Sequence, residues 1–433
     1  LLDKVEVFKV RSPDLIGQGI GGVVNLVPKT AFDFEDSFVV AASGQVGYQE
    51  LRKGDQPVKG DLTIGGRFGA DEQFGILIGG SYSDRTFTSY GLYPDDWEED
   101  SDAARGGLPI NAKYTDYRLN RERIGATGSL DWRGDNLELY VRGLYSEFSE
   151  DEYRQRFRLQ WNPDNVVFDA NGVTAVASDV QQRNELRLEQ KDKSILSVMA
   201  GGAFDIQDWR VDFGVARTHN EVTEPNQSWQ FRADDIGDVA LDFSDEIFSA
   251  RPIDGFAEPS ELGFRSYSEQ DEKGEEDIWQ GRFDVTRDLA GDTGSFVKAG
   301  VNMRWTDKSF DGENVSYTRG PVGSRFNLDG LTSGNLTVYP AEDRGYIISP
   351  VIDEDLLVDF TRDNLGGPLF VLDPASTLED GTLGDFAVEE EVHSHALANR
   401  CCTGTRDARV VDDAIAKAHL HGYASAEARV KTV

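Results

Sequence analysis

The sequence has no long apolar run, few cations and almost no cysteine. No stretch reaches the 18 consecutive apolar residues that would suggest a membrane-spanning helix. The first 400 residues contain no cysteine, which excludes a disulfide scaffold for the main body of the chain. The 78 Asp and Glu outnumber the 44 Lys and Arg, giving a formal net charge of −34. Nucleic-acid binding needs a basic surface, so we expect no nucleic-acid partner.

The chain also lacks an initial methionine and a signal peptide. Residues 1–7 already alternate as in a strand, so we expect a fragment whose N-terminal part is missing. A membrane protein built from strands remains open, because a spanning β-strand needs only about 9–11 residues with one apolar face.

Apolar and polar residues alternate with a period of two through residues 37–310. Positions 74, 76, 78 and 82 form one apolar face, and positions 297–305 repeat the pattern with Lys298, Asn302 and Arg304 opposite. Charged residues behind an apolar stripe need water on their side, which a wide barrel provides between outer lipid and a wet lumen. We predict nine antiparallel strands near residues 37–49, 57–69, 73–88, 116–131, 136–149, 186–205, 209–222, 276–289 and 295–310.

The links between these strands alternate in length, except that the first, around residues 51–57, is short where a long link is expected. Tight turns are predicted at 69–72, 133–136, 207–208 and 290–294, and long links near 89–115, 150–185, 223–275 and from 311 onward. Short turns at one end and long loops at the other are typical of transmembrane barrels. If residues 23–34 lie at the periplasmic end, every tight turn is periplasmic and every long loop is outside.

A glycine-rich segment precedes the first strand. Gly17, Gly19 and Gly22 match the dinucleotide pattern G-x-G-x-x-G, which requires a helix to follow it. Residues 23–27 favour a strand instead, and Pro28 forbids a helix interior. We therefore predict a tight turn rather than a nucleotide site.

This region carries a resemblance to a known family. Residues 5–14, reading VEVFKVRSPD, and residues 19–26, reading GIGGVVNL, resemble the end of the plug in TonB-dependent outer-membrane receptors. Those proteins carry a similar VEV-x-K-[GS]-P … G-x-GG-x-[IV]-N pattern. The ending at residues 30–34 most resembles the subgroup often linked to carbohydrate uptake.

The resemblance implies an all-β, plugged transmembrane antiparallel barrel of about 22 strands when complete. The predicted division is the end of the plug at 1–34, the N-terminal part of the barrel with long extracellular loops at 35–385, and an atypical tail at 386–433. Gly19, Gly21, Gly22 and Asn25 then form the structural plug-junction motif. The implied surroundings are the outer membrane of a Gram-negative bacterium, its lipid, and a TonB-type periplasmic energy transducer that contacts a segment absent here.

The tail departs from the barrel pattern. His393, His395, His419 and His421 flank the adjacent pair Cys401-Cys402, and residues 412–419 favour a short Ala-rich helix. One hypothesis is a His/Cys metal site, although adjacent cysteines are not the usual zinc spacing. The favoured alternative is a change of reading frame or gene model near 385–390 that adds a foreign tail, so we expect no metal site.

The outer loops hold the candidate ligand-binding residues Tyr90, Tyr93, Asp95, Asp96 and Trp97. Aromatic rings there could stack on a sugar or chelate while carboxylates bind hydroxyls or a cationic group. Residues 219–277 add 17 Asp and Glu against 4 Lys and Arg. The alternative is a solvated acidic surface, because charge runs usually face water.

No defined catalytic site emerges, since His219 has no evident nucleophile partner. We expect no enzyme and no cofactor. The predicted function is TonB-dependent, energy-coupled uptake of a scarce carbohydrate, oligosaccharide or ferric chelate. The alternatives are an outer-membrane binding or adhesion protein and a passive porin on the same barrel.

Overall fold

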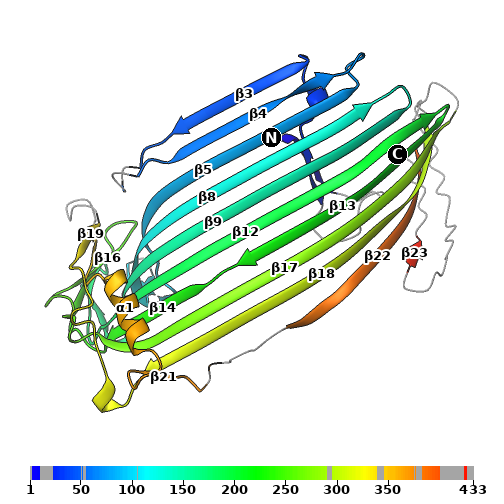
Figure 1. Cartoon of the computed structure of the whole chain (residues 1–433). Helices are drawn as coiled ribbons and strands as arrows, with labels where there is room; N and C mark the ends of the chain where they lie inside the picture. Colours follow the sequence, from blue (N-terminus) through cyan, green and yellow to red (C-terminus); the bar gives the residue numbers. More distant parts are fainter. Residues whose placement is uncertain are drawn as a thin grey trace.

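The largest part of the fold is one long β-sheet (Figure 1). The structure is a computed structural model that describes residues 2–9, 23–49, 51, 55–104, 106–289, 295–338, 346–374, 376, 383–399 and 424–426. Its main sheet has 13 strands, and every pair is antiparallel except β22 with β23. The main path runs through β3 (Phe38–Val46), β4 (Val58–Phe68), β5 (Phe74–Leu92), β8 (Asn111–Arg133), β9 (Leu137–Gln160), β12 (Gln181–Ile206), β13 (Trp209–Thr223), β17 (Gly263–Asp288), β18 (Phe296–Arg319), β22 (Leu383–Asn399) and β23 (Ala424–Ala426).

All nine predicted strands are present, and the all-β antiparallel class is confirmed. The predicted lengths of the long links were too great, because the strands continue into the residues assigned to the links. β9 runs on to Gln160, β12 starts at Gln181, and the link predicted at 223–275 contains β14 (Asn226–Ala233) and the first half of β17. Side chains alternate between the two faces in these extensions as well, so the hydrogen bonding between strands continues beyond the apolar part of each strand.

The predicted turns at 69–72 and 207–208 are confirmed. Gly69 and Gln207 adopt positive φ angles of 103° and 54°, which is how the chain reverses in so few residues. The turn predicted at 290–294 lies outside the described residues.

The two faces of the sheet differ as predicted. Apolar side chains on one face stay open to the surroundings, with Ile78 and Val215 56% and 50% exposed. The opposite face, here called the polar face, buries Asp131 against Arg142 at 2.8 Å. A sheet that is apolar on one side and charged on the other is consistent with part of a β-barrel wall.

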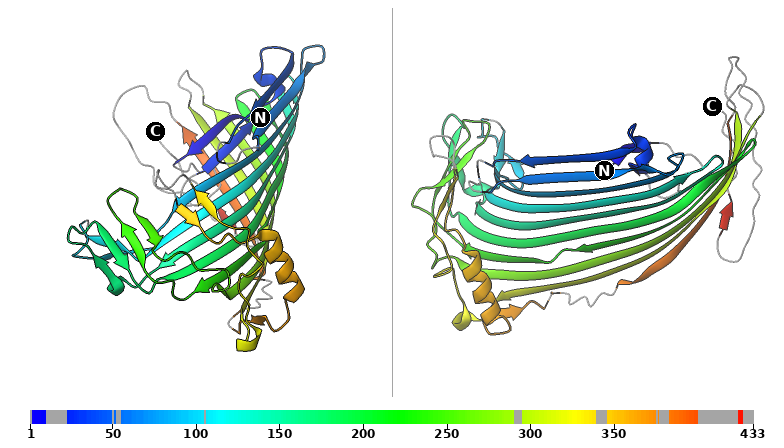
Figure 2. Two further views of the ribbon diagram at one scale, coloured as in Figure 1. Left: turned by 90° about the vertical axis from the view of Figure 1, so that its left-hand side faces the viewer. Right: turned by 45° about the horizontal axis from the view of Figure 1, so that its top comes forward.

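The long links gather at one end of the sheet, together with the helix α1 (Glu354–Asn364) (Figures 1 and 2). A four-stranded sheet forms there from β10 (Val166–Phe168), β11 (Thr174–Ala177), β15 (Val239–Asp242) and β16 (Ser249–Pro252). Smaller pairs join β6 (Trp97–Glu99) to β7 (Gly107–Pro109) and β19 (Leu336–Val338) to β20 (Tyr346–Ile348), and β21 (Phe370–Leu372) extends β18.

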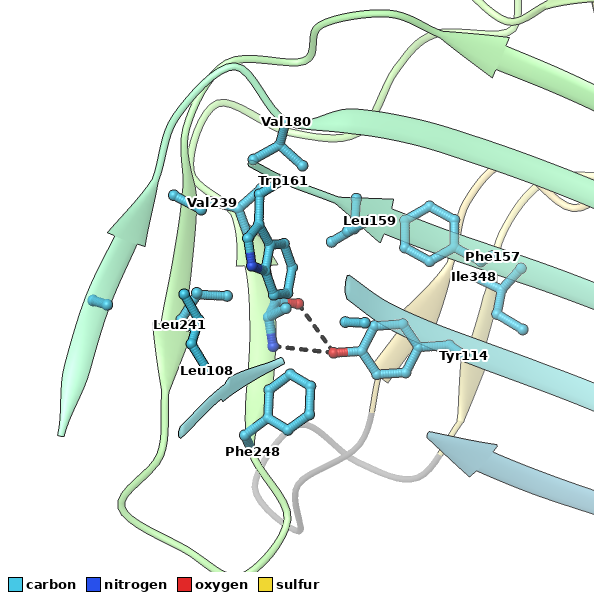
Figure 3. Close-up of a cluster of buried hydrophobic side chains, with 14 residues drawn as sticks. Leu108, Tyr114, Phe157, Leu159, Trp161, Val180, Val239, Leu241, Phe248 and Ile348 are labelled. Carbon is cyan, nitrogen blue, oxygen red and sulfur yellow. Dashed lines mark hydrogen bonds between the residues drawn. The ribbon is translucent and has the colours of Figure 1, made fainter. Parts of the chain in front are cut away.

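Two buried clusters attach these links to the strand ends. Around Tyr114, Phe157 and Trp161, the Tyr114 hydroxyl bonds both backbone groups of Ala250, at 3.0 and 3.3 Å (Figure 3). In the second cluster, Trp229 donates its indole N–H to Thr361 of α1 at 2.9 Å. Apolar burial and satisfied polar groups thus fix the link end as a folded unit.

The N-terminal residues form a two-stranded pair and a short 3₁₀ turn, and the turn packs on the polar face of β4 and β5. β1 (Leu2–Phe8) pairs with β2 (Val23–Pro28), and Asn25 Nδ2 donates to Glu6 at 2.9 Å. The strand predicted after the glycines is therefore confirmed, whereas Gly19, Gly21 and Gly22 lie outside the described residues. The 3₁₀ turn η1 (Ala31–Asp33) seats Phe32 against Gly75, with the Arg133 guanidinium 4.1 Å from the ring centroid.

The C-terminal segment is described in part. β22 pairs antiparallel with β18 and runs across the predicted boundary at residue 385. Cys401, Cys402 and the helix predicted at 412–419 lie outside the described residues, so both hypotheses for the tail stay predictions.

Candidate ligand-binding site

A row of cations crosses the polar face at the link end of the sheet. The strand register places Lys113 of β8 opposite Arg158 of β9, Arg158 opposite Arg183 of β12, and Arg183 opposite Arg232 of β14. Arg265 of β17 joins them, because it shares the carboxylate of Asp234 with Arg232. We call these five residues the cation row. Directly opposed residues on antiparallel strands lie about 4.5–5.5 Å apart at Cα.

Local sequence explains why these side chains share a face. In residues 153–160, reading YRQRFRLQ, arginines alternate with Tyr, Gln, Phe and Leu. The period of two sends Phe157 and Leu159 into the buried cluster and leaves Arg158 on the polar face. Residues 182–189 of β12, reading QRNELRLE, also place charged side chains at every second position, which sets Arg183 beside Arg158.

Two carboxylates neutralise the ends of the row. Asp95, in the link after β5, binds Lys113 and lies 2.9 Å from Arg158. Burial opposes ionisation of Asp95, but the hydrogen bond from Lys113 and the charge of Arg158 outweigh it and hold the pKa of this carboxyl below its usual value. At the other end, Asp234 contacts both Arg232 and Arg265 at 2.7 Å.

Burial likewise opposes ionisation of Asp234, yet its two arginines lower the pKa of this carboxyl. Both end carboxylates are therefore charged at neutral pH.

The middle of the row has no such counter-ion. Arg183 donates through Nη2 to the amide oxygen of Gln181 at 3.2 Å, and no carboxylate of the described residues lies within ion-pair distance of it. The nearest acidic neighbour along the strand, Glu185, pairs instead with Arg156 at 3.1 Å. Arg183 is thus a partly exposed cation held between two other cations.

This arrangement costs folding free energy. Like charges directly opposite each other on a sheet are destabilising. Two unit charges about 5 Å apart repel by roughly 1–3 kcal/mol for effective dielectric constants between 80 and 20. A bound anion would remove this repulsion, and a guanidinium can hold a carboxylate or phosphate through two parallel hydrogen bonds. The row is suited to binding an oxyanion.

The residues predicted from the sequence do not gather at one point. Asp95 pairs with one end of the cation row, whereas Asp96 accepts the backbone N–H of Trp97 at 2.8 Å. Trp97 packs edge-on against Phe248, with centroids 6.0 Å apart, and lines a cavity of ≈ 180 Å³. Tyr93 lies over Gly91, and Tyr90 stands on β5 opposite Asp116. Their role in ligand binding stays a prediction.

The acidic stretch 219–277 is not a uniform solvated surface. Asp234 binds two arginines of the row, and Asp277 pairs with Arg217 at 3.1 Å and with His219 at 3.3 Å. The arginines were missed because residues 150–185 and 223–275 were read as loops. The alternation of arginine with apolar residues in 153–160 was a signal that could have found them.

Two features are absent from the described part of the chain. Among the described residues, no group of three or more His, Cys, Asp and Glu could hold a metal ion. No helix in the described part of the chain is long and apolar enough to cross a membrane.

Comparison with known proteins finds a weak structural similarity. No family model and no curated protein matches the chain. A solved structure that it resembles is BauA, the ferric preacinetobactin receptor from Acinetobacter baumannii, at 14% identity and a TM-score of 0.21. The match covers 69% of this chain and 46% of BauA, so the chain spans less than half of that receptor.

Proposed function

We propose that this chain forms part of the wall of an outer-membrane receptor that takes up an anionic small molecule. The substrate class is a ferric chelate with free acidic groups or an acidic oligosaccharide. A TonB-type periplasmic transducer supplies the energy, and the role is transport rather than catalysis. Outer-membrane lipid covers the apolar face.

The cation row is the observation that carries this proposal. The chain has a formal net charge of −34, yet five cations collect on the polar face of its sheet, at the end where the links fold. Asp95 and Asp234 neutralise the ends of the row, but Arg183 stands opposite Arg158 and Arg232, and an anion bound to Arg183 would relieve the remaining repulsion. The exposed apolar face, opposite the row, supports the lipid-facing part of the proposal.

Uptake by a deletion strain tests the function. The strain is complemented with the wild type or with Arg183→Gln and supplied with radiolabelled ferric chelates or acidic oligosaccharides. We expect wild-type uptake to stop on adding a protonophore, and Arg183→Gln to reduce uptake at low substrate concentration.

The alternatives give different results in the same assay. Uptake that persists after the protonophore indicates a passive porin, and surface binding without uptake indicates a binding or adhesion protein. Equal uptake by the wild type and by Arg183→Gln at every concentration would contradict a role for the row.

A further inference from the structure

We infer that the ligand is a multivalent oxyanion and that it binds by exchanging with Asp95. The inference rests on the proposed function, because it concerns the same cation row. It adds the number and spacing of the anionic groups that the ligand must carry, and the residue that it replaces.

Asp95 already occupies the place of a ligand carboxylate. It comes from the link after β5 rather than from the strands that carry the row, and its two oxygens contact Lys113 and Arg158. Asn111 donates to the same carboxylate at 3.2 Å and accepts the Asp95 backbone N–H at 3.2 Å. The Asp95 side chain remains 33% exposed, so an incoming anion can reach it.

The exchange with Asp95 determines how many anionic groups the ligand must carry. A single carboxylate that replaces Asp95 recovers only the contacts that Asp95 gives up, and it also loses its translational freedom on binding. Net affinity therefore requires a second anionic group that reaches Arg183. Adjacent strands are spaced about 4.8 Å apart, so the two groups should lie roughly 5 Å from each other. Acetate and chloride fail this requirement, whereas a tricarboxylate meets it.

Asp234 is less suited to exchange. It follows β14 directly and stands two residues from Arg232, so a displaced Asp234 would stay beside the row and repel the ligand. The partly exposed Asp95 side chain can turn into solvent while its link stays bonded to β8 through the backbone of Tyr93. That link continues into Trp97, whose ring contacts Phe248, so exchange at Asp95 should change the surroundings of Trp97.

The test compares Asp95→Asn with the matched control Asp96→Asn in the full-length protein purified in detergent. Asp96 is the neighbouring carboxylate, and its side chain accepts the backbone N–H of Trp97 instead of contacting the row. The probes are tricarballylate and acetate, measured by calorimetry and by tryptophan fluorescence. Trp97→Phe identifies which part of the signal comes from Trp97.

We expect the wild type to bind tricarballylate and not acetate, with a change in Trp97 fluorescence. Asp95→Asn should bind tricarballylate roughly tenfold more tightly, because the competing carboxylate is gone. Asp96→Asn should match the wild type. The fluorescence change on binding should be smaller in Asp95→Asn, because the carboxylate that the ligand displaces is absent.

Three results would overturn the inference in different ways. Unchanged or weaker tricarballylate binding by Asp95→Asn, while Arg183→Gln abolishes binding, refutes the exchange but leaves the anion site intact. Equal affinity for acetate and tricarballylate refutes the multivalent ligand. If the wild type binds neither tricarballylate nor the transported chelate, and Arg183→Gln changes nothing, the proposed anion site itself fails.

Discussion

Replacing Arg183 by Gln should separate ligand affinity from stability. The change removes the central cation of the row but keeps a polar side chain of similar length. Arg183 faces Arg158 on one side and Arg232 on the other. Its one described hydrogen bond goes to the Gln181 amide, at 3.2 Å, and an amide N–H of the new side chain can replace it.

The two effects should have opposite signs. Each like-charge contact costs about 1 kcal/mol where water reaches the pair, so Arg183→Gln should raise the free energy of unfolding by about 1–2 kcal/mol or leave it unchanged. Hydrogen bonds to charged groups contribute about 1.5–3 kcal/mol, which predicts a roughly 10- to 150-fold loss of affinity for an anionic ligand.

The assay measures unfolding and tricarballylate binding on the same preparations of the protein in detergent. Arg123→Gln is the control, since Arg123 lies farther along β8 and packs over the ring of Phe148 instead of joining the row. Both differences should shrink in 1 M salt, where the screening length falls to about 3 Å. An Arg183→Gln variant that is clearly less stable and binds the anion like the wild type would refute the reasoning.

Three further predictions concern the N-terminal turn, the apolar face and Asp95. A Cβ at Gly75 would lie 2.6 Å from the ring of Phe32, so Gly75→Ala should destabilise the seating of the N-terminal link by about 1–3 kcal/mol. Gly128→Ala meets open space and should be neutral, and thermal unfolding compares the two variants. If the apolar face contacts lipid, Ile78→Lys should make membrane insertion less favourable by about 2–4 kcal/mol and lower the amount of folded protein in the outer membrane, whereas Ser81→Lys on the other face should not. Membrane fractionation followed by heat-modifiability electrophoresis tests this. The pKa of Asp95 is lowered in the folded state, so its stabilising contribution is present above the unfolded pKa near 4 and is lost as the pH falls below that value. Trp97 fluorescence should therefore change below about pH 4 in the wild type and stay flat in Asp95→Asn.

Much of the sheet could be predicted from the sequence because its signals are local. Alternation at positions 74–82 and 297–305 assigned the two faces, and short polar segments located the turns at Gly69 and Gln207. The strand after the glycines followed from its β-branched residues and Pro28. Each of these inferences depends on neighbours within a few positions, where steric preference and burial act directly.

The strand ends and the site could not be predicted in the same way. Arg158 and Arg183 looked like parts of a polar loop, because nothing near them in the chain reveals which residues stand opposite. Similarly, Asp95 appeared with Tyr93 and Trp97 as one of several loop residues, whereas in the folded chain it neutralises Lys113 and Arg158.

The sequence by itself determined the period of two, the turn positions and the strongly acidic balance. Only the tertiary structure decided that cations from five strands meet in one row and that a carboxylate from a sixth segment covers its end. The physical reason is register: cross-strand neighbours are set by pairing over tens of residues, and the electrostatics of the site exist only once that pairing is made.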